Sequence, residues 1–167
     1  MIVMQLEPIK GDCLLANYEG WITLDDVSWE ISREPKESGK GMTADLNFGI
    51  AEAAPVNVKK ALDVASCDLM KMATGGGISP ATCKIHFIES GKATGTGKTY
   101  ESFFEIDLER PVVKKWSIDG SGDERPSENI ELMYNKIEMQ YTSIDAKGAP
   151  IKSGKKGWDL SKGEGLG

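Results

Sequence analysis

The stretch NIELMYNKIEMQYTSI, residues 129–144, carries the most information about the fold. Apolar and polar residues alternate along it, which is the period of a half-buried β-strand. The apolar residues fall into two sets of opposite parity, Ile130, Leu132 and Tyr134 in the first and Ile137, Met139 and Tyr141 in the second. The buried face therefore changes side near Asn135, which predicts a β-bulge or a sharp bend there.

Most of the chain outside this stretch also has the period of a strand. The predicted strands lie within residues 2–8, 22–33, 44–50, 82–90, 100–110, 111–118 and 157–160. A length of 167 residues suits one domain, and no internal repeat or interdomain linker is visible. We therefore expect a mainly β protein with a single domain spanning residues 1–167.

One segment has the period of a helix, and it follows Pro55. The apolar residues at spacings of four and three are Val58, Leu62, Ala65, Leu69 and Met72. This spacing predicts a helix with an apolar face, ended by the glycines at 75–77. Lys59, Lys60 and Asp63 are expected on its other faces.

The stretch GKATGTGKTY, residues 91–100, resembles a phosphate-binding loop. A P-loop needs a glycine five residues before its Gly-Lys-Thr, but Lys92 occupies that position. Such a loop must also open a helix, whose N-terminal N–H groups hold the phosphate. The following residues, 100–110, have the period of a strand, so a hairpin connection is predicted instead of a nucleotide site.

Charge and composition exclude several classes of function. A net charge of −6 and an isoelectric point near 4.9 argue against a nucleic-acid partner. No apolar run approaches the length of a membrane span, so no membrane partner is expected. The start of the chain lacks the pattern of a signal peptide, so we expect the protein to be made and folded in the cytoplasm.

Residues able to support catalysis or bind metal are few. The chain has one histidine, His86, which lies within a predicted strand. The cysteines Cys13, Cys67 and Cys83 form no Cys-x-x-Cys pair and are expected to be small buried hydrophobic residues. We therefore predict no catalytic residues, no metal and no cofactor.

Several longer stretches resemble the haemolysin-coregulated protein family. In the second half they are GSGDERPSENIELMYNKIEMQY (120–141), DAKG (145–148) and GWDL (157–160). In the first half they are VSWEIS (27–32), ADLNF (44–48) and ATCKIHFIESG (81–91). The resemblance covers nearly the whole chain, with its elements in the same order.

This resemblance implies a structural function. Members of the family form the inner tail tube of the bacterial type VI secretion apparatus, as hexameric rings that stack into a tube. The implied fold is a β-barrel of two antiparallel sheets with one α-helix packed alongside. The implied partners are further copies of the chain, the sheath and spike of the apparatus, and small effectors carried in the lumen. The apparatus releases its tube outside the cell without a signal peptide.

Two groups of residues are candidates for these contacts. Asp26, Ser28 and Glu30 alternate with Val27 and Trp29. The first three are expected on a water-facing surface, which by resemblance lines the lumen, and the other two are expected to be buried. The polar loop from Glu34 to Met42 is the candidate for contacts between subunits, through Glu34, Lys36, Glu37, Lys40 and Met42.

Two other functions stay open on the sequence. One is a monomeric β-barrel module that binds a small ligand. The other is a hydrolase built on His86 with serine or acidic partners. Oligomeric state separates the tube subunit from the first, and replacement of His86 tests the second.

Overall fold

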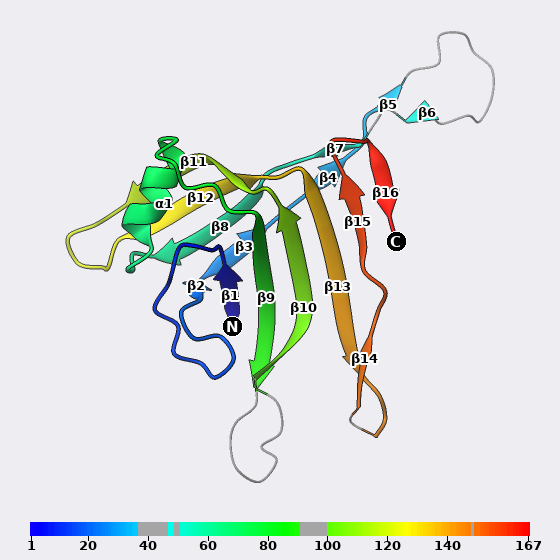
Figure 1. Cartoon of the computed structure of the whole chain (residues 1–167), viewed down its shortest axis with the longest axis horizontal. Coiled ribbons are helices and arrows are strands. Elements are labelled where there is room, and N and C mark those ends of the chain that lie inside the picture. Colours follow the sequence, from blue (N-terminus) through cyan, green and yellow to red (C-terminus); the bar gives the residue numbers. More distant parts are fainter. Residues whose placement is uncertain (37–46, 49–50, 91–99, 148) are drawn as a thin grey trace.

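A computed structural model describes residues 1–36, 47–48, 51–90, 100–147 and 149–167. It consists of two antiparallel sheets packed face to face, with one short helix beside the smaller sheet (Figure 1). The expectation of two antiparallel sheets and one helix is confirmed. The sheets are hydrogen-bonded separately rather than as one closed barrel in the described part of the chain.

The larger sheet has eight strands. They are β1 (Ile2–Gln5), β2 (Ile22–Leu24), β9 (Thr82–Ser90), β10 (Tyr100–Glu109), β13 (Lys136–Ile144), β14 (Pro150–Lys152), β15 (Lys156–Asp159) and β16 (Glu164–Leu166). Their order is β16-β15-β13-β10-β9-β1-β2, and β14 pairs with the far end of β13.

The smaller sheet has four strands in the order β11-β12-β8-β3. They are β3 (Asp26–Ser28), β8 (Val56–Ala61), β11 (Val112–Asp119) and β12 (Ser127–Met133). The helix α1 (Ser66–Ala73) lies beside β11 (Figure 1). Two short ribbons lead away from the sheets, formed by β4 (Ile31–Ser32) with β7 (Glu52–Ala53) and β5 (Pro35–Lys36) with β6 (Asn47–Phe48).

The hydrophobic core fills the space between the two sheets. Alternate residues of each strand point into it, as period-two patterning requires. Its most completely covered apolar side chains are Met4, Leu6, Ile22, Leu69, Ile85, Leu108, Ile130, Leu132 and Ile137. On the other side of the larger sheet, residues of the N-terminal segment (residues 6–21) cover part of β1 and β9 through a second apolar cluster of Val3, Cys13, Tyr18 and Ile88. The rest of that face, and the outer face of the smaller sheet, remain for solvent or for partners.

The change of parity near Asn135 is the point where the chain crosses between the sheets. β12 ends at Met133 in the smaller sheet, and β13 begins at Lys136 in the larger one. Asn135 is held at the crossing because its N–H donates to the Glu109 carbonyl at 3.0 Å and its carbonyl accepts from Leu160 N at 2.8 Å. The predicted bend is confirmed, and one sequence stretch thus supplies a strand to each layer.

The predicted helix after Pro55 is half wrong. Residues Val56–Ala61 form β8, and only Ser66–Ala73 are helical. Val56 and Val58 point into the core while Asn57 and Lys59 face out, which is a period of two. Lys60 occupies the next inward position. Because this residue is charged, the alternation of apolar and polar residues cannot be recognised from the sequence. The helix does end before Gly75, whose positive φ suits glycine.

The predicted strand at residues 22–33 is divided into β2, β3 and β4. Val27 and Trp29 are half-buried rather than buried as predicted. Trp29 is held at the rim of the core because its indole N–H donates to Tyr134 Oη at 2.5 Å. Tyr134 Oη in turn donates to the Ala54 carbonyl at 3.0 Å.

A charged cluster lies inside the core, between the smaller sheet and α1. Lys60 and Glu128 are both 0% exposed, and Lys60 Nζ lies 2.5 Å from Glu128 Oε1. Lys60 Nζ also donates to Asp63 Oδ1 at 2.7 Å. Glu128 accepts two further hydrogen bonds, from Ser66 Oγ at 2.9 Å and from Trp116 Nε1 at 2.6 Å. Every member of the cluster is thus hydrogen-bonded, which a buried charge requires.

Among the described helices, none has the length and apolar character needed to cross a bilayer.

Replacing Lys60 with methionine is expected to lower the free energy of unfolding by about 3–5 kcal/mol, because two carboxylates then remain buried without their cation. Lys59→Met is the matched control, since Lys59 is the preceding residue and faces solvent. It is expected to change the same quantity by no more than about 0.5 kcal/mol.

Urea unfolding of the two variants measures this difference. The double variant Lys60→Met with Glu128→Leu is expected to recover part of the loss, because it removes both buried charges together. Equal stabilities for Lys60→Met and Lys59→Met contradict the role given to the cluster.

Candidate functional site

The solvent face of the smaller sheet forms a shallow polar groove of about 210 Å³. Two of the three predicted lumen residues, Asp26 and Ser28, line it. Both are exposed on β3, at the edge of the sheet. The sequence prediction that they face water is therefore confirmed.

Strand register arranges the groove residues in two rows across the sheet. The rows are Asp26, Lys59, Asn129 and Ser117, and Ser28, Asn57, Glu131 and Lys115. The row between them, Val27, Val58, Ile130 and Trp116, points to the opposite side, into the core. Residues from four strands that are separated along the sequence thus lie on one surface.

The chemistry of the groove is polar and nearly balanced in charge. Glu131 lies between two lysines, with Lys114 Nζ at 3.5 Å and Lys115 Nζ at 3.6 Å. Asn129 Nδ2 donates to Asp119 Oδ2 at 2.8 Å. Amides, hydroxyls and weakly held ions of both signs suit transient contact with a hydrated surface more than tight binding of one small molecule.

The other predicted residues lie away from this groove. Glu30 is exposed but does not line it. Glu34 is exposed just before the outer ribbon, and Lys36 is in β5. Glu37, Lys40 and Met42 lie outside the described residues.

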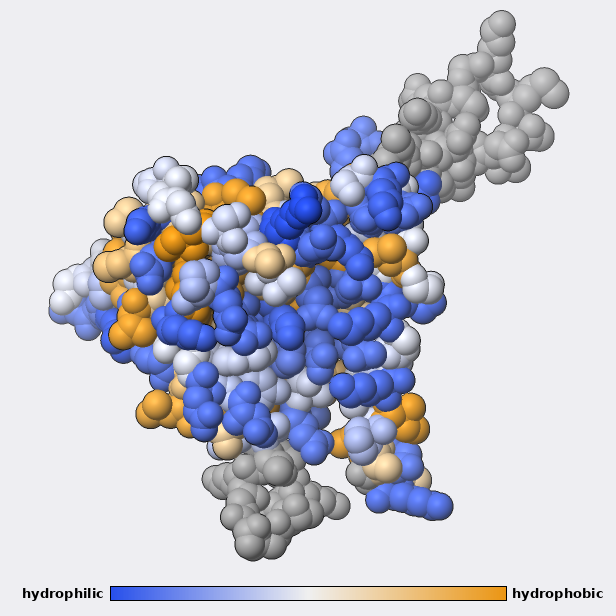
Figure 2. Space-filling model, in the orientation of Figure 1, coloured by the Kyte–Doolittle hydropathy of each residue, from blue (hydrophilic) through white to orange (hydrophobic). Residues whose placement is uncertain are grey.

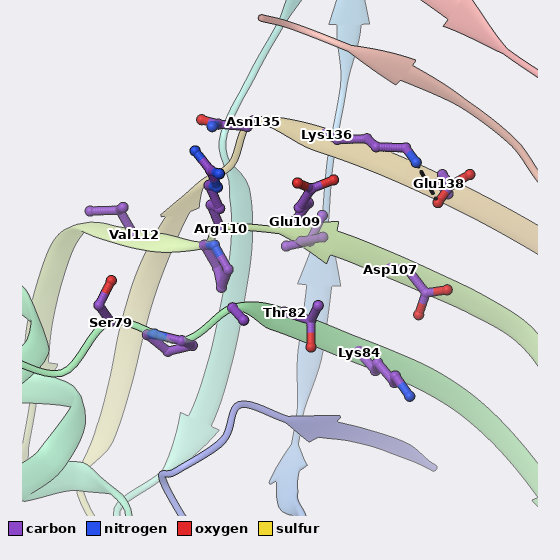
Figure 3. A pocket seen from close by; sticks show the side chains of 14 residues that line it. Ser79, Thr82, Lys84, Asp107, Glu109, Arg110, Val112, Asn135, Lys136 and Glu138 are labelled. Carbon is purple, nitrogen blue, oxygen red and sulfur yellow. Dashed lines mark ion pairs between the residues drawn. The ribbon is translucent and has the colours of Figure 1, made fainter.

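A second, larger hollow of about 920 Å³ lies on the solvent face of the eight-stranded sheet (Figure 3). It sits where β9 begins, β10 ends and β13 begins, close to the crossings between the sheets. Its charged lining residues are Lys84, Asp107, Glu109, Arg110, Lys136 and Glu138. Sequence reasoning missed this hollow because its residues come from three strands that are separated along the chain.

Half of the charges at this hollow are already paired. Lys136 Nζ lies 3.1 Å from Glu138 Oε2, and Asp107 accepts a hydrogen bond from Lys155. This bond raises the pKa of the Lys155 ammonium group. The result is a polar, ion-paired surface, which matches the largely hydrophilic face of this sheet in Figure 2.

His86 lies on the same face of the larger sheet, under the N-terminal segment (residues 6–21). Tyr18 and Trp21 pack against its ring, with centroid distances of 5.8 Å and 4.9 Å, and Tyr18 Oη lies 3.4 Å from Nδ1. Burial lowers the pKa of His86, although the nearby carboxylates of Glu105 and Asp107 act in the opposite direction. The packing of these two aromatic rings against the imidazole favours a structural role for His86.

The glycine-rich stretch joins two antiparallel strands. β9 and β10 pair from Thr82 opposite Glu109 to Ser90 opposite Tyr100, with one register shift between Ser102 and Phe104. Residues 91–99 themselves lie outside the described part of the chain. The element that follows is a strand, as predicted, so the helix that a P-loop must open is replaced by β10.

The cysteines divide into two kinds. Cys13 and Cys83 are buried as predicted, and burial raises the pKa of the Cys83 thiol well above its usual range. Cys67 is exposed on α1, so the prediction that it is buried is wrong. Across the described residues, no group of three or more histidine, cysteine or acidic side chains is placed to hold a metal ion.

The single histidine allows a direct titration test. Because burial lowers the folded-state pKa of His86 below 6.5, the unfolded chain binds this proton more tightly. The contribution of His86 to stability is therefore fully present above pH 6.5. It decreases as the pH falls from 6.5 to the lower folded-state pKa of His86. An NMR titration of the ring proton is expected to give a midpoint below 6.5, and Trp21→Ala is expected to move it upward by exposing the ring. A midpoint at or above 6.5 in the parent protein contradicts this account.

Solved structures resemble this fold over nearly its full length. A protein described as a type six secretion system protein has a TM-score of 0.84 and 24% identity, covering 99% of this chain and 98% of its own. Hcp1 from Salmonella typhimurium has a TM-score of 0.69 and 16% identity, covering 99% and 97%. The secreted protein Hcp3 from Pseudomonas aeruginosa has a TM-score of 0.55 and 15% identity, covering 91% and 96%. At these identities the likeness establishes the fold.

The sequence itself establishes the family. No curated protein sequence is a significant match to the chain. The family described as "Type VI secretion system effector, Hcp" matches residues 3–141, which is most of the chain. The resemblance seen in the sequence is thereby confirmed: this chain belongs to the Hcp family of type VI secretion proteins.

Proposed function

We propose that this chain is the subunit of a type VI secretion inner tail tube, assembled as stacked hexameric rings with the polar groove facing the lumen. Membership of the Hcp family supports the secretion role, and that role is structural rather than enzymatic. The observation that carries the lumen assignment is the groove itself, with Asp26 and Ser28 among its rows of hydroxyls, amides and balanced charges. Glu30 continues this exposed surface beyond β3.

A polar, charge-balanced wall suits a channel through which cargo must pass. Strong apolar or single-sign patches would hold a cargo protein, whereas hydrated side chains of both signs compete with water only weakly. Small effectors are therefore the proposed occupants of the lumen. No single groove residue is assigned a specific cargo.

The two-layer fold gives the subunit two separate outward surfaces. The two sheets pack against each other through their apolar faces. The groove therefore lies on the outer face of the smaller sheet, and the hollow near Arg110 lies on the outer face of the larger sheet. If the groove faces the lumen, the hollow faces away from it. We assign that outer face to the sheath, the other long-lived partner of a tail tube.

Open sheet edges supply contacts within a ring. β3 and β11 are the two edges of the smaller sheet, and their outer backbone groups have no partner strand in the described part of the chain. Such edges invite pairing with another chain. Joining the β11 edge of one copy to the β3 edge of the next would extend the polar face around the ring by a head-to-tail interface.

The projecting ribbon is proposed for contacts between subunits, as the loop from Glu34 to Met42 was in the sequence analysis. The β5–β6 pair extends away from the body of the molecule (Figure 1). Two-stranded ribbons are marginally stable alone in water, so a neighbouring copy is the natural support. In this proposal the protein folds in the cytoplasm, is incorporated beside the spike and sheath, and is secreted with the tube.

Native mass spectrometry of the purified protein at micromolar concentration tests the ring. The expected species is a hexamer, because a stable head-to-tail interface usually buries about 1,200–2,000 Å² in total. A protein that remains monomeric contradicts the tube assignment. That result favours the alternative of a monomeric ligand-binding module, whose site is then the hollow of about 920 Å³.

A further inference from the structure

We infer that residues 10–21 form a strap on the larger sheet, which closes over a neutral His86 and opens when this ring takes up a proton. The strap is the greater part of the loop between β1 and β2 (Figure 1). Its opening uncovers the part of β1 and β9 that lies beneath it. All the residues concerned belong to one subunit, so the inference goes beyond the proposed tube function and does not depend on it.

The strap is a loop closed by its own backbone. Gly11 N donates to the Gly20 carbonyl, and Gly20 N donates to the Cys13 carbonyl, both at 2.9 Å. At the two ends of the strap the chain is fixed in the main core by Ile9 and Ile22, which are 3% and 0% exposed. A loop with fixed ends and internal hydrogen bonds can move away from the sheet as one unit.

Apolar side chains hold the strap against the sheet. Cys13 and Tyr18 are buried where they pack with Val3 of β1 and Ile88 of β9. This small cluster lies on the outer face of the larger sheet and is separate from the main core on the inner face. Contacts of the strap can therefore be lost while the core stays intact.

His86 lies directly beneath two aromatic side chains of the strap. The centroid of the Trp21 ring is 4.9 Å from that of the imidazole, and Tyr18 Oη is 3.4 Å from Nδ1. A neutral imidazole can accept a hydrogen bond from the Tyr18 hydroxyl at Nδ1, whereas an imidazolium ring carries a proton on each nitrogen and accepts none. Protonation thus removes this bond and places a charge where water is partly excluded.

Charged side chains of the sheet act on His86 in both directions. Glu105 of β10 lies directly opposite His86, and Asp107 follows two residues along the same face. These two carboxylates favour the imidazolium ion, whereas Lys84 and Lys152 oppose it. Burial has the largest influence and lowers the pKa of His86.

β1 and the strap also pack against the ring. β1 places the uncharged Val3 opposite His86, and the amino group of Met1 donates to the Ile88 carbonyl at 3.0 Å. Tyr18 keeps its proton, because burial raises the pKa of its hydroxyl. The charged residues of the strap are all exposed: Lys10, Asp12 and Glu19. Burial beneath the strap is therefore the main influence that opposes protonation.

Opening of the strap and protonation of His86 are coupled for this reason. When the strap lifts, water reaches the ring while Glu105 and Asp107 stay beside it, so the pKa of His86 rises. The open form then binds the proton more tightly than the closed form, and acid favours opening. Because one proton is taken up, the ratio of open to closed forms increases by up to about tenfold for each pH unit in this window.

The reactivity of Cys13 measures the opening, because this residue is buried only while the strap is closed. The protein is the full chain with Cys67→Ser, which removes the exposed thiol. Labelling by a pyridyl disulfide is followed by peptide mass spectrometry, and each rate is divided by that of the urea-unfolded chain at the same pH. The ratio for Cys13 is expected to increase as the pH falls below 6.5, by up to about tenfold per unit. Cys83, which is 0% exposed in the main core, is the internal control and is expected to stay protected.

Two variants assign the effect to His86. In His86→Gln the ratio for Cys13 is expected to be independent of pH, because the titrating group is removed. Glu105→Gln is expected to move the onset of opening to lower pH, because this carboxylate favours the imidazolium ion. Glu109→Gln is the matched control, since Glu109 lies on the same face of β10 beyond Asp107, and it is expected to leave the onset unchanged.

The inference is overturned if the labelling of Cys13 does not change with pH, or if it changes equally in His86→Gln. It is also overturned if Cys83 loses its protection together with Cys13, since acid then unfolds the whole subunit. A protein that is monomeric but whose strap opens as described refutes the tube function alone. A hexamer without a pH-dependent strap refutes this inference alone, so the two failures are distinguishable.

Discussion

The buried ion pair between Lys60 and Glu128 is the interaction on which the arrangement of the smaller sheet and α1 depends. It joins β8 to β12, and through Ser66 and Trp116 it reaches the helix and β11. A buried pair is weak evidence for added stability, because desolvation of both ions opposes their attraction. Its effect is to make other arrangements costly: a shift of β8 by one residue would turn Lys60 and the apolar residues Val56 and Val58 to solvent and bring Asn57 into the core.

The same inward lysine explains the main error in predicting the fold. Period-two alternation identified β9, β10, β12 and β13 because their inward positions are apolar. In β8 a charged residue occupies an inward position, so Val58 and Leu62 were grouped with the true helical residues Leu69 and Met72. A lysine is tolerated there because of its long-range contact with Glu128. The spacing of apolar residues around Lys60 gives no sign of that contact.

The candidate surfaces were predictable to different degrees. The alternation around Ser28 was enough to place Asp26 and Ser28 on a solvent face. Their neighbours Asn57, Asn129 and Glu131 depend on strand order and register, which the sequence pattern does not contain. The hollow beside Arg110 was missed for the same reason. Its residues look like ordinary polar or loop positions until the topology brings them together.

The roles proposed for the two solvent faces follow from the way the core is formed. Because the apolar faces of both sheets are used against one another, a polar face is left on each side of the subunit. A tube subunit needs this arrangement, since one side meets the lumen and the other meets the surrounding sheath. The orientation of the smaller sheet in the ring is therefore the central claim.

A cryo-EM reconstruction of the assembled protein tests that claim most directly. The account predicts a hexameric ring in which Asp26, Ser28 and Lys59 point toward the central channel and the hollow lined by Arg110 faces outward. A ring in which the face bearing Ser28 is buried between subunits, or turned to the outside, contradicts it.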